Sequence, residues 1–251
     1  MLRSIDLSRA GMLRQQRSLD ATAHNIANSA TPGFKALRTA LESGDGGPAP
    51  VDEASAPALT AYARVGRQLT QGPLRATGMM TDFAVEGEGY FVVRRPDGSA
   101  GYTRNGAFHL DAGGQVVDGG GNVVQPATTV PPGATGLRVG ADGTVTVSLQ
   151  GGANQTIGQV RLARFANPHG LAAGADGLFA ATPASGAARI VAPGQDGTGR
   201  VHAGVLESTN AELSDQLTDM LGAQRAFQLN TSAFRMADDM LRIATQMAGT
   251  T

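Results

Sequence analysis

The feature that most constrains the fold is a heptad repeat of apolar residues near the C-terminus. From residue 206 to residue 248 an apolar side chain recurs at every seventh position, and no proline interrupts the segment. As one helix this segment would be roughly 65 Å long, about twice the span of a compact domain of this size. We therefore predict a coiled-coil helix that packs lengthwise on a partner. The residues of this C-terminal seam are Leu206, Leu213, Met220, Phe227, Phe234 and Leu241.

A repeat of the same period at the other end of the chain supplies a partner. Residues 1–43 carry six basic and three acidic side chains, whereas residues 206–248 carry three basic and six acidic. Opposite net charges favour the pairing of two apolar-seamed helices and set their register. The alternative is two amphipathic helices that each lie on the central domain, although such helices seldom exceed about 20 residues. The N-terminal seam consists of Ile5, Met12, Leu19 and Ile26.

Turn residues predict where the first helix ends and where a linker follows. Pro32 and Gly33 stop the helix, and Phe34 provides an apolar anchor after the turn. We assign residues 1–43 to the N-terminal helix and its stop. Residues 44–81 are predicted to form a linker or mobile segment, because their first part is almost all Gly, Pro, Ala, Asp, Glu, Ser and Val.

The middle of the chain has the pattern of antiparallel strands. In residues 82–201, short β-branched runs are separated by turns such as Asp142-Gly143, which precedes a strand-like run at residues 144–149. Asp-Gly supplies the positive φ angle that tight hairpins require. We therefore predict an α+β fold, in which an antiparallel all-β domain is inserted between long terminal helices that form a coiled-coil stem. Residues 202–251 are assigned to the C-terminal helix.

Composition and charge exclude several classes of protein. The net charge of −1 gives no electrostatic footprint for nucleic acid or membrane. The chain has no cysteine, so disulfides and thiolate metal sites are excluded. No apolar run approaches the ~18 residues of a membrane span. Arg9, Arg14 and Arg17 interrupt any apolar core of a signal peptide, so export would need another route.

The sequence predicts no catalytic, cofactor-binding or metal-binding residues. The four histidines are scattered, without the spacing of three or four that would put two ligands on one helical face. Lys35 is the only lysine and lies in no phosphate-binding loop. Glu86 and Glu88 could in principle serve as paired carboxylates of a glycan hydrolase, but they flank a glycine turn that favours exposure to solvent. A secreted glycan-binding module also remains an alternative.

Several motifs resemble, in order, those of bacterial flagellar axial proteins of the rod and hook family. The resemblance covers nearly the whole chain and is closest to the distal rod members, with the proximal rod members second. Hook-type members usually carry an additional outer domain, for which this chain has no room. The matching segments are residues 25–28, 31–35, 82–91, 102–108, 157–171, 207–210 and 224–230.

The resemblance implies a structural subunit without enzymatic activity. Such a subunit would be exported unfolded by the flagellar type III apparatus, without a cleaved signal peptide. It would polymerise into a helical tube that crosses the periplasm and transmits torque from the motor to the hook. The terminal helices would line the tube and the β domain would form its wall. Partners would be further copies and other rod and hook proteins, and the two seams together with Phe34 would form the subunit interface.

Overall fold

The computed structural model describes residues 2–43, 61–140, 142–174 and 177–248, which form two compact units. The first, the helical unit, contains Met1–Ala27, Ala36–Gln68 and Ala211–Thr251. The second, the β unit, contains Asn28–Lys35 and Leu69–Asn210. Both chain ends therefore build the helical unit, and the short segment after the first helix belongs to the β unit. The part of the predicted linker at residues 44–60 lies outside the described residues.

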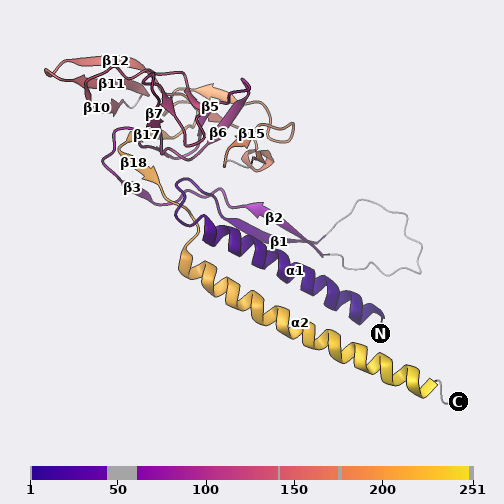
Figure 1. The fold of residues 1–251 in the computed structure, drawn as a ribbon. Helices are drawn as coiled ribbons and strands as arrows, with labels where there is room; N and C mark the ends of the chain where they lie inside the picture. Colours follow the sequence, from indigo (N-terminus) through magenta and orange to yellow (C-terminus); the bar gives the residue numbers. More distant parts are fainter. Residues whose placement is uncertain (1, 44–60, 141, 175–176, 249–251) are drawn as a thin grey trace. The chain divides into compact units, whose positions relative to one another are not determined.

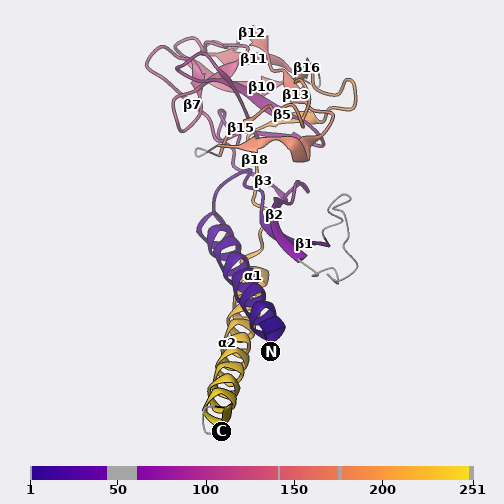
Figure 2. The ribbon, with the colours of Figure 1, turned by 90° about the vertical axis from the view of Figure 1, so that its right-hand side faces the viewer.

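The helical unit is built on two helices that run antiparallel side by side (Figures 1 and 2). These are α1 (Leu2–Ala27) and α2 (Leu213–Ala248). Their direction follows from two contacts, because Asn25 at the end of α1 bonds to Gln216 at the start of α2, whereas Met12 meets Thr231 further along. An antiparallel pair, β1 (Leu37–Ser43) and β2 (Ala61–Arg67), completes the unit.

Three boundaries differ from the prediction. The C-terminal helix begins at Leu213, because Leu206 belongs to strand β18 and pairs with Arg75 of β3. Residues 37–43 follow the helix stop as a strand. Residues 61–67 and 74–76, which the prediction assigned to a linker, are also strands. In each case the backbone forms its hydrogen bonds with a strand that is distant in the sequence. The local composition of a segment does not show that such a partner exists.

The strands of the β unit pair antiparallel throughout the described residues. The largest sheet there runs β14-β15-β6-β5-β9-β8-β7, with β13 joining β5 to β16, and a smaller sheet runs β10-β11-β12. Two further pairs are β17 with β4 and β18 with β3. The bounds are β3 (Leu74–Ala76), β4 (Phe83–Glu86), β5 (Tyr90–Arg94), β6 (Ala100–Thr103), β7 (His109–Leu110), β8 (Val116–Val117), β9 (Val123–Gln125), β10 (Ala134–Val139) and β11 (Thr144–Leu149). They continue with β12 (Asn154–Gln159), β13 (Leu162–Arg164), the 3-10 helix η1 (Pro168–Gly170), β14 (Ala172–Ala173), β15 (Phe179–Ala180), β16 (Arg189–Val191), β17 (Arg200–Ala203) and β18 (Val205–Glu207).

Strand β5 divides the core of the β unit into two apolar clusters. Because side chains alternate along a strand, Phe91 and Val93 enter one cluster while Tyr90 and Val92 enter the other. In the second cluster the Tyr90 ring meets Phe165 edge to face, with ring centroids 5.9 Å apart. The core of an all-β unit with few aromatic residues is therefore built on both faces of one central strand.

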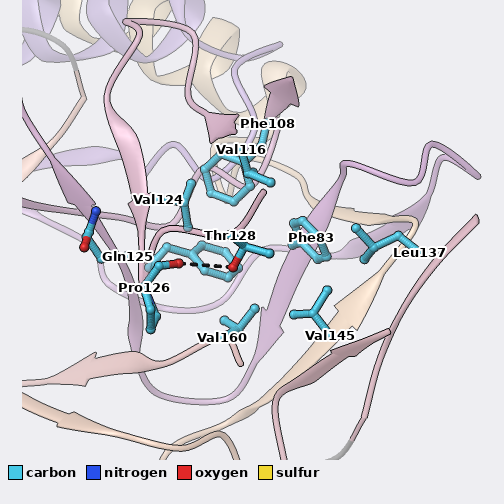
Figure 3. Close-up of a pocket in the computed structure, with 11 residues that line it drawn as sticks. Phe83, Phe108, Val116, Val124, Gln125, Pro126, Thr128, Leu137, Val145 and Val160 are labelled. Carbon is cyan, nitrogen blue, oxygen red and sulfur yellow. Dashed lines mark hydrogen bonds between the residues drawn. The ribbon is translucent and has the colours of Figure 1, made fainter. Parts of the chain in front are cut away.

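The first cluster encloses a small apolar cavity (Figure 3). Its volume is about 20 Å³, and its lining includes Phe83, Val116 and Val145. The Thr128 hydroxyl is satisfied by the Pro126 carbonyl oxygen, 3.2 Å away. A space of this size holds about one water molecule. The cavity is therefore a packing defect and offers no room for a substrate.

Candidate functional site: a helix pair and a buried ionic cluster

Part of the two seams predicted from the heptads lies where α1 and α2 pair within one chain. Met12 and Leu19 on α1 are half-buried, as are Met220 and Phe234 on α2. Ala223, between the last two on the same face, is fully buried. The pair is close enough that a Cβ atom on Gly11 would lie 3.0 Å from the Asn230 side chain. The apolar periodicity thus serves first to join the two ends of the chain.

The remaining predicted interface residues have different positions. Leu213 is exposed, and Phe227 keeps 38% of its surface exposed. Ile26 is half-buried near the end of α1. Leu206 and Phe34 are half-buried in the β unit. The side chains of Ile5 and Leu241 lie outside the described part of the structure.

One buried amide ties the helical unit together. The Asn25 side chain donates hydrogen bonds to the Leu37 carbonyl oxygen and to Gln216 Oε1, each 2.8 Å away. Its Oδ1 accepts a hydrogen bond from the Leu37 backbone N–H at 2.8 Å. Asn25 thereby connects α1, β1 and α2. The sequence places Asn25 in a motif but does not predict that it connects these three elements. The one sign of this in the sequence is a polar side chain next to Ile26 of the apolar seam.

A buried ionic cluster lies in the β unit, centred on Glu207 at the end of β18. Glu207 Oε1 is 2.5 Å from Lys35 Nζ and accepts a hydrogen bond from the Gly72 N–H at 3.0 Å. Its Oε2 is 3.5 Å from Arg104 Nη1. Lys35 also donates to the Thr70 carbonyl oxygen at 2.8 Å. All three charged side chains are buried, so each depends on these partners in place of water.

Arg104 links the cluster to the core of the β unit. Its Nη2 donates to the Gly87 carbonyl oxygen at 2.6 Å, and its guanidinium lies 5.3 Å from the centre of the Tyr90 ring. Burial lowers the pKa of Arg104, and Glu207 opposes that shift. Burial likewise lowers the pKa of Lys35, which Glu207 raises and Arg104 lowers further. Two cations thus share one carboxylate in a site with little water.

A glycine allows the segment after α1 to reach this cluster. Gly33 has φ +67°, and a Cβ atom there would lie 2.5 Å from the backbone of Arg104 and Asn105. Its N–H donates to the Glu207 carbonyl oxygen at 2.7 Å. Three motifs far apart in sequence, at residues 31–35, 102–108 and 207–210, therefore meet in one place. Sequence reasoning identified each motif, but no local pattern showed that they touch.

The residues considered for other chemistry contact basic side chains at the surface. Glu86 Oε2 lies 2.8 Å from His202 Nε2, and Glu88 Oε2 lies 3.1 Å from Arg164 Nε, all on exposed side chains. Among the described residues, no three side chains of His, Asp or Glu gather in a way that could hold a metal ion. Within the same residues, neither helix has an apolar stretch long enough for a membrane span.

Comparison with known families gives three matches along the chain. Residues 5–35 match the model described as flagella basal body rod protein. Residues 84–147 match the D1 domain of flagellar hook protein FlgE/F/G, and residues 202–247 match the C-terminal segment of flagellar basal body rod FlgEFG proteins. The outer two matches contain most of α1 and most of α2, while the middle one lies in the β unit.

Individual relatives are similar over nearly the full chain. The flagellar basal-body rod protein FlgG of Borreliella burgdorferi is 32% identical, over 98% of this chain and 99% of its own length. FlgG of Caulobacter vibrioides is 34% identical over the same shares of the two chains. The flagellar basal-body rod protein FlgF of Escherichia coli is 32% identical over 90% of each chain.

Proposed function

The chain belongs to the flagellar basal-body rod protein family and is FlgG-like over nearly its whole length, and we propose that copies of it polymerise into the helical tube of the distal rod. In this role the protein is a structural part of the flagellum and has no enzymatic activity. The proposed tube passes torque from the motor to the hook. Its neighbours are other rod and hook proteins.

The observation that carries the proposal is the pairing of the two chain ends in α1 and α2. The pair gives each copy a rod-like element about 40 to 54 Å long, estimated from the lengths of the two helices. Such elements stack lengthwise in a tube, and in this proposal they line its inner surface while the β unit forms the wall. The buried ionic cluster suits a mechanical part, because it joins three distant segments through charges whose separation inside the protein would leave each of them buried without a partner.

The route to the periplasm is part of the proposal. We infer export by the flagellar type III apparatus without a cleaved signal peptide, as the family resemblance implies. A chain that folds only after export must then bring segments together that lie far apart in the sequence. Lys35 and Glu207, 172 positions apart, form such a contact.

A place in the proximal rod is the second candidate. It is supported by the match to FlgF of Escherichia coli, whose identity equals that of some FlgG relatives although a smaller share of the chain is covered. Complementation of a bacterial strain that lacks its FlgG gene distinguishes between the distal and the proximal rod. Expression of this chain should restore motility there, and immunogold label should lie on the hook-proximal part of isolated basal bodies. Label confined to the motor end of the rod would support the proximal place, and complete rods formed without the chain would refute both.

A further inference from the structure

Helix α2 carries a second apolar stripe that the chain itself does not cover. We call it the outer stripe, and its large side chains lie between Leu229 and Ile243. Apolar side chains so exposed on one helix are unusual for a surface that faces only water. The exposed fractions are 72% for Leu229, 58% for Met236, 61% for Met240 and 55% for Ile243.

The spacing of the outer stripe is that of a helix contact. The intervals between its residues alternate between three and four positions, and every one of these residues is apolar. This is the pattern of a coiled-coil seam. Leu229 follows Phe227 by two positions, a rotation of about 200° around the helix, so the stripe faces away from the C-terminal seam. The positions are Ala226, Leu229, Ala233, Met236, Met240 and Ile243.

The first turns of α2 expose a different apolar group, the leucine stripe. Leu213, Leu217 and Leu221 follow one another at intervals of four and are 49%, 45% and 53% exposed. Its centre, Leu217, and the centre of the outer stripe, Met236, are about 28 Å apart along the helix axis. One helix thus has two exposed apolar stripes, displaced from each other along its length.

We propose that the outer stripe of one copy binds the leucine stripe of α2 in a second copy, with the two helices parallel and staggered by about 28 Å. This inference rests on the proposed polymerisation and names the surfaces that carry it. All copies in a polar helical filament point the same way, so neighbouring α2 helices run nearly parallel. A head-to-tail contact between two different patches is the kind that continues without closing.

Charge supports the same pairing. The segment of α2 that bears the leucine stripe is acidic, because exposed Asp215 and Asp219 have no basic neighbour between residues 211 and 224. The segment that a stagger of about 28 Å places beside it, residues 230–243, carries Arg235 and Arg242 as well as two aspartates. The parallel stagger therefore sets an acidic segment beside a segment that has no net charge and offers two arginines. A contact between two leucine stripes would instead place two acidic segments together.

Cross-linking tests the contact directly, because the chain has no cysteine of its own. Two variants, Leu217→Cys and Met236→Cys, are oxidised under polymerising conditions, separately and as a mixture. The two positions in one helix are about 28 Å apart, far beyond the ~7 Å Cα separation of a disulfide. The mixture should give cross-linked dimers, and each variant alone should give none. Cross-linking of Met236→Cys alone would show a symmetric contact and overturn the proposal.

A polymerisation assay gives an independent measurement. Met236→Glu should raise the critical concentration for filament growth at least about tenfold, because a charge would be buried in the contact. The matched control is Gln228→Glu, which adds the same charge to an exposed position outside both stripes and should change the value less than about twofold. Helical content by circular dichroism should be the same in both variants. Equal critical concentrations for the two would refute the contact.

The outcomes separate this inference from the proposed function. If the unaltered chain forms filaments but the mixture of Leu217→Cys and Met236→Cys gives no cross-linked dimer under the same conditions, the contact alone is refuted, because another surface would then drive polymerisation. A chain that forms no filaments under any condition, and does not restore motility, would refute the proposed function and the contact with it.

Discussion

At the scale of single residues, Glu207 is a fully buried side chain that joins distant segments of the β unit. Its carboxylate accepts from Lys35, Arg104 and the Gly72 N–H, and its backbone carbonyl accepts from Gly33. Buried ion pairs add little net stability compared with apolar residues of the same shape, but removal of one partner leaves uncompensated charge. The value of Glu207 is therefore that it fixes which segments meet.

Removal of this carboxylate should destabilise the β unit strongly. Glu207→Ala leaves two buried cations without their anion and should lower the free energy of unfolding by about 3 to 5 kcal/mol. Urea denaturation followed by tyrosine fluorescence measures this, since Tyr90 and Tyr102 lie in the core of the same unit. The control is Glu86→Ala, which breaks an exposed pair and should cost about 1 kcal/mol or less. Equal losses in the two variants would contradict this view of the cluster.

The lowered pKa of Lys35 makes a prediction about alkaline stability. Between that pKa and the ordinary value of 10.5, the unfolded chain binds more protons at this position than the folded chain. The free energy of unfolding should therefore rise with pH in this window. Lys35→Met should reduce that slope at alkaline pH below 10.5. Denaturation curves across this range measure it, and an unchanged slope would show that Lys35 keeps an ordinary pKa.

At the scale of elements, the helix pair depends on one polar residue as well as on its apolar seams. Asn25 bonds to both neighbours of α1, the strand β1 and the helix α2. A buried amide with all its bonds made specifies register, because any shift of one helix along the other would break them. Apolar seams alone tolerate such shifts more easily.

Asn25→Ala should therefore lower the stability of the helical unit more than Gln216→Ala, which removes the partner of Asn25 on α2. The change leaves the Leu37 N–H and carbonyl without their side-chain partner and should destabilise the helical unit by about 1 to 3 kcal/mol. Gln216→Ala removes only one of the three bonds and should cost about 1 kcal/mol or less. Thermal unfolding followed by far-UV circular dichroism reports on both helices. A larger loss for Gln216→Ala would place the important contact on α2 instead.

At the scale of the whole molecule, the opposite charges of the two ends should affect assembly. Residues 1–43 and 206–248 have net charges of +3 and −3. Contacts between exposed charges are weak and are screened by salt, so they influence the rate and register of association more than final stability. Polymerisation followed by light scattering should slow as salt rises from low to moderate concentration. The melting temperature of the β unit in the same buffers is the control, and a rate independent of salt would exclude this role.

The sequence by itself determined the features that depend on neighbours in the chain. Heptad spacing is a local property and predicted helices at both ends. Repeated Asp-Gly turns predicted an antiparallel β unit between them. Pro32 and Gly33 predicted that the first helix ends near them, and α1 ends at Ala27, five residues before Pro32.

Only the tertiary structure decided the features that depend on contacts between distant segments. Leu206 fits the heptads, yet it lies in a strand because β3 offers its backbone a partner. Lys35, Arg104 and Glu207 look like ordinary surface charges in sequence, and only the fold brings them together in a buried site. The heptads also could not show which apolar face of α2 the chain's own helix covers. Hydrogen bonds, ion pairs and packing across more than a hundred residues are set by topology, which no local pattern records.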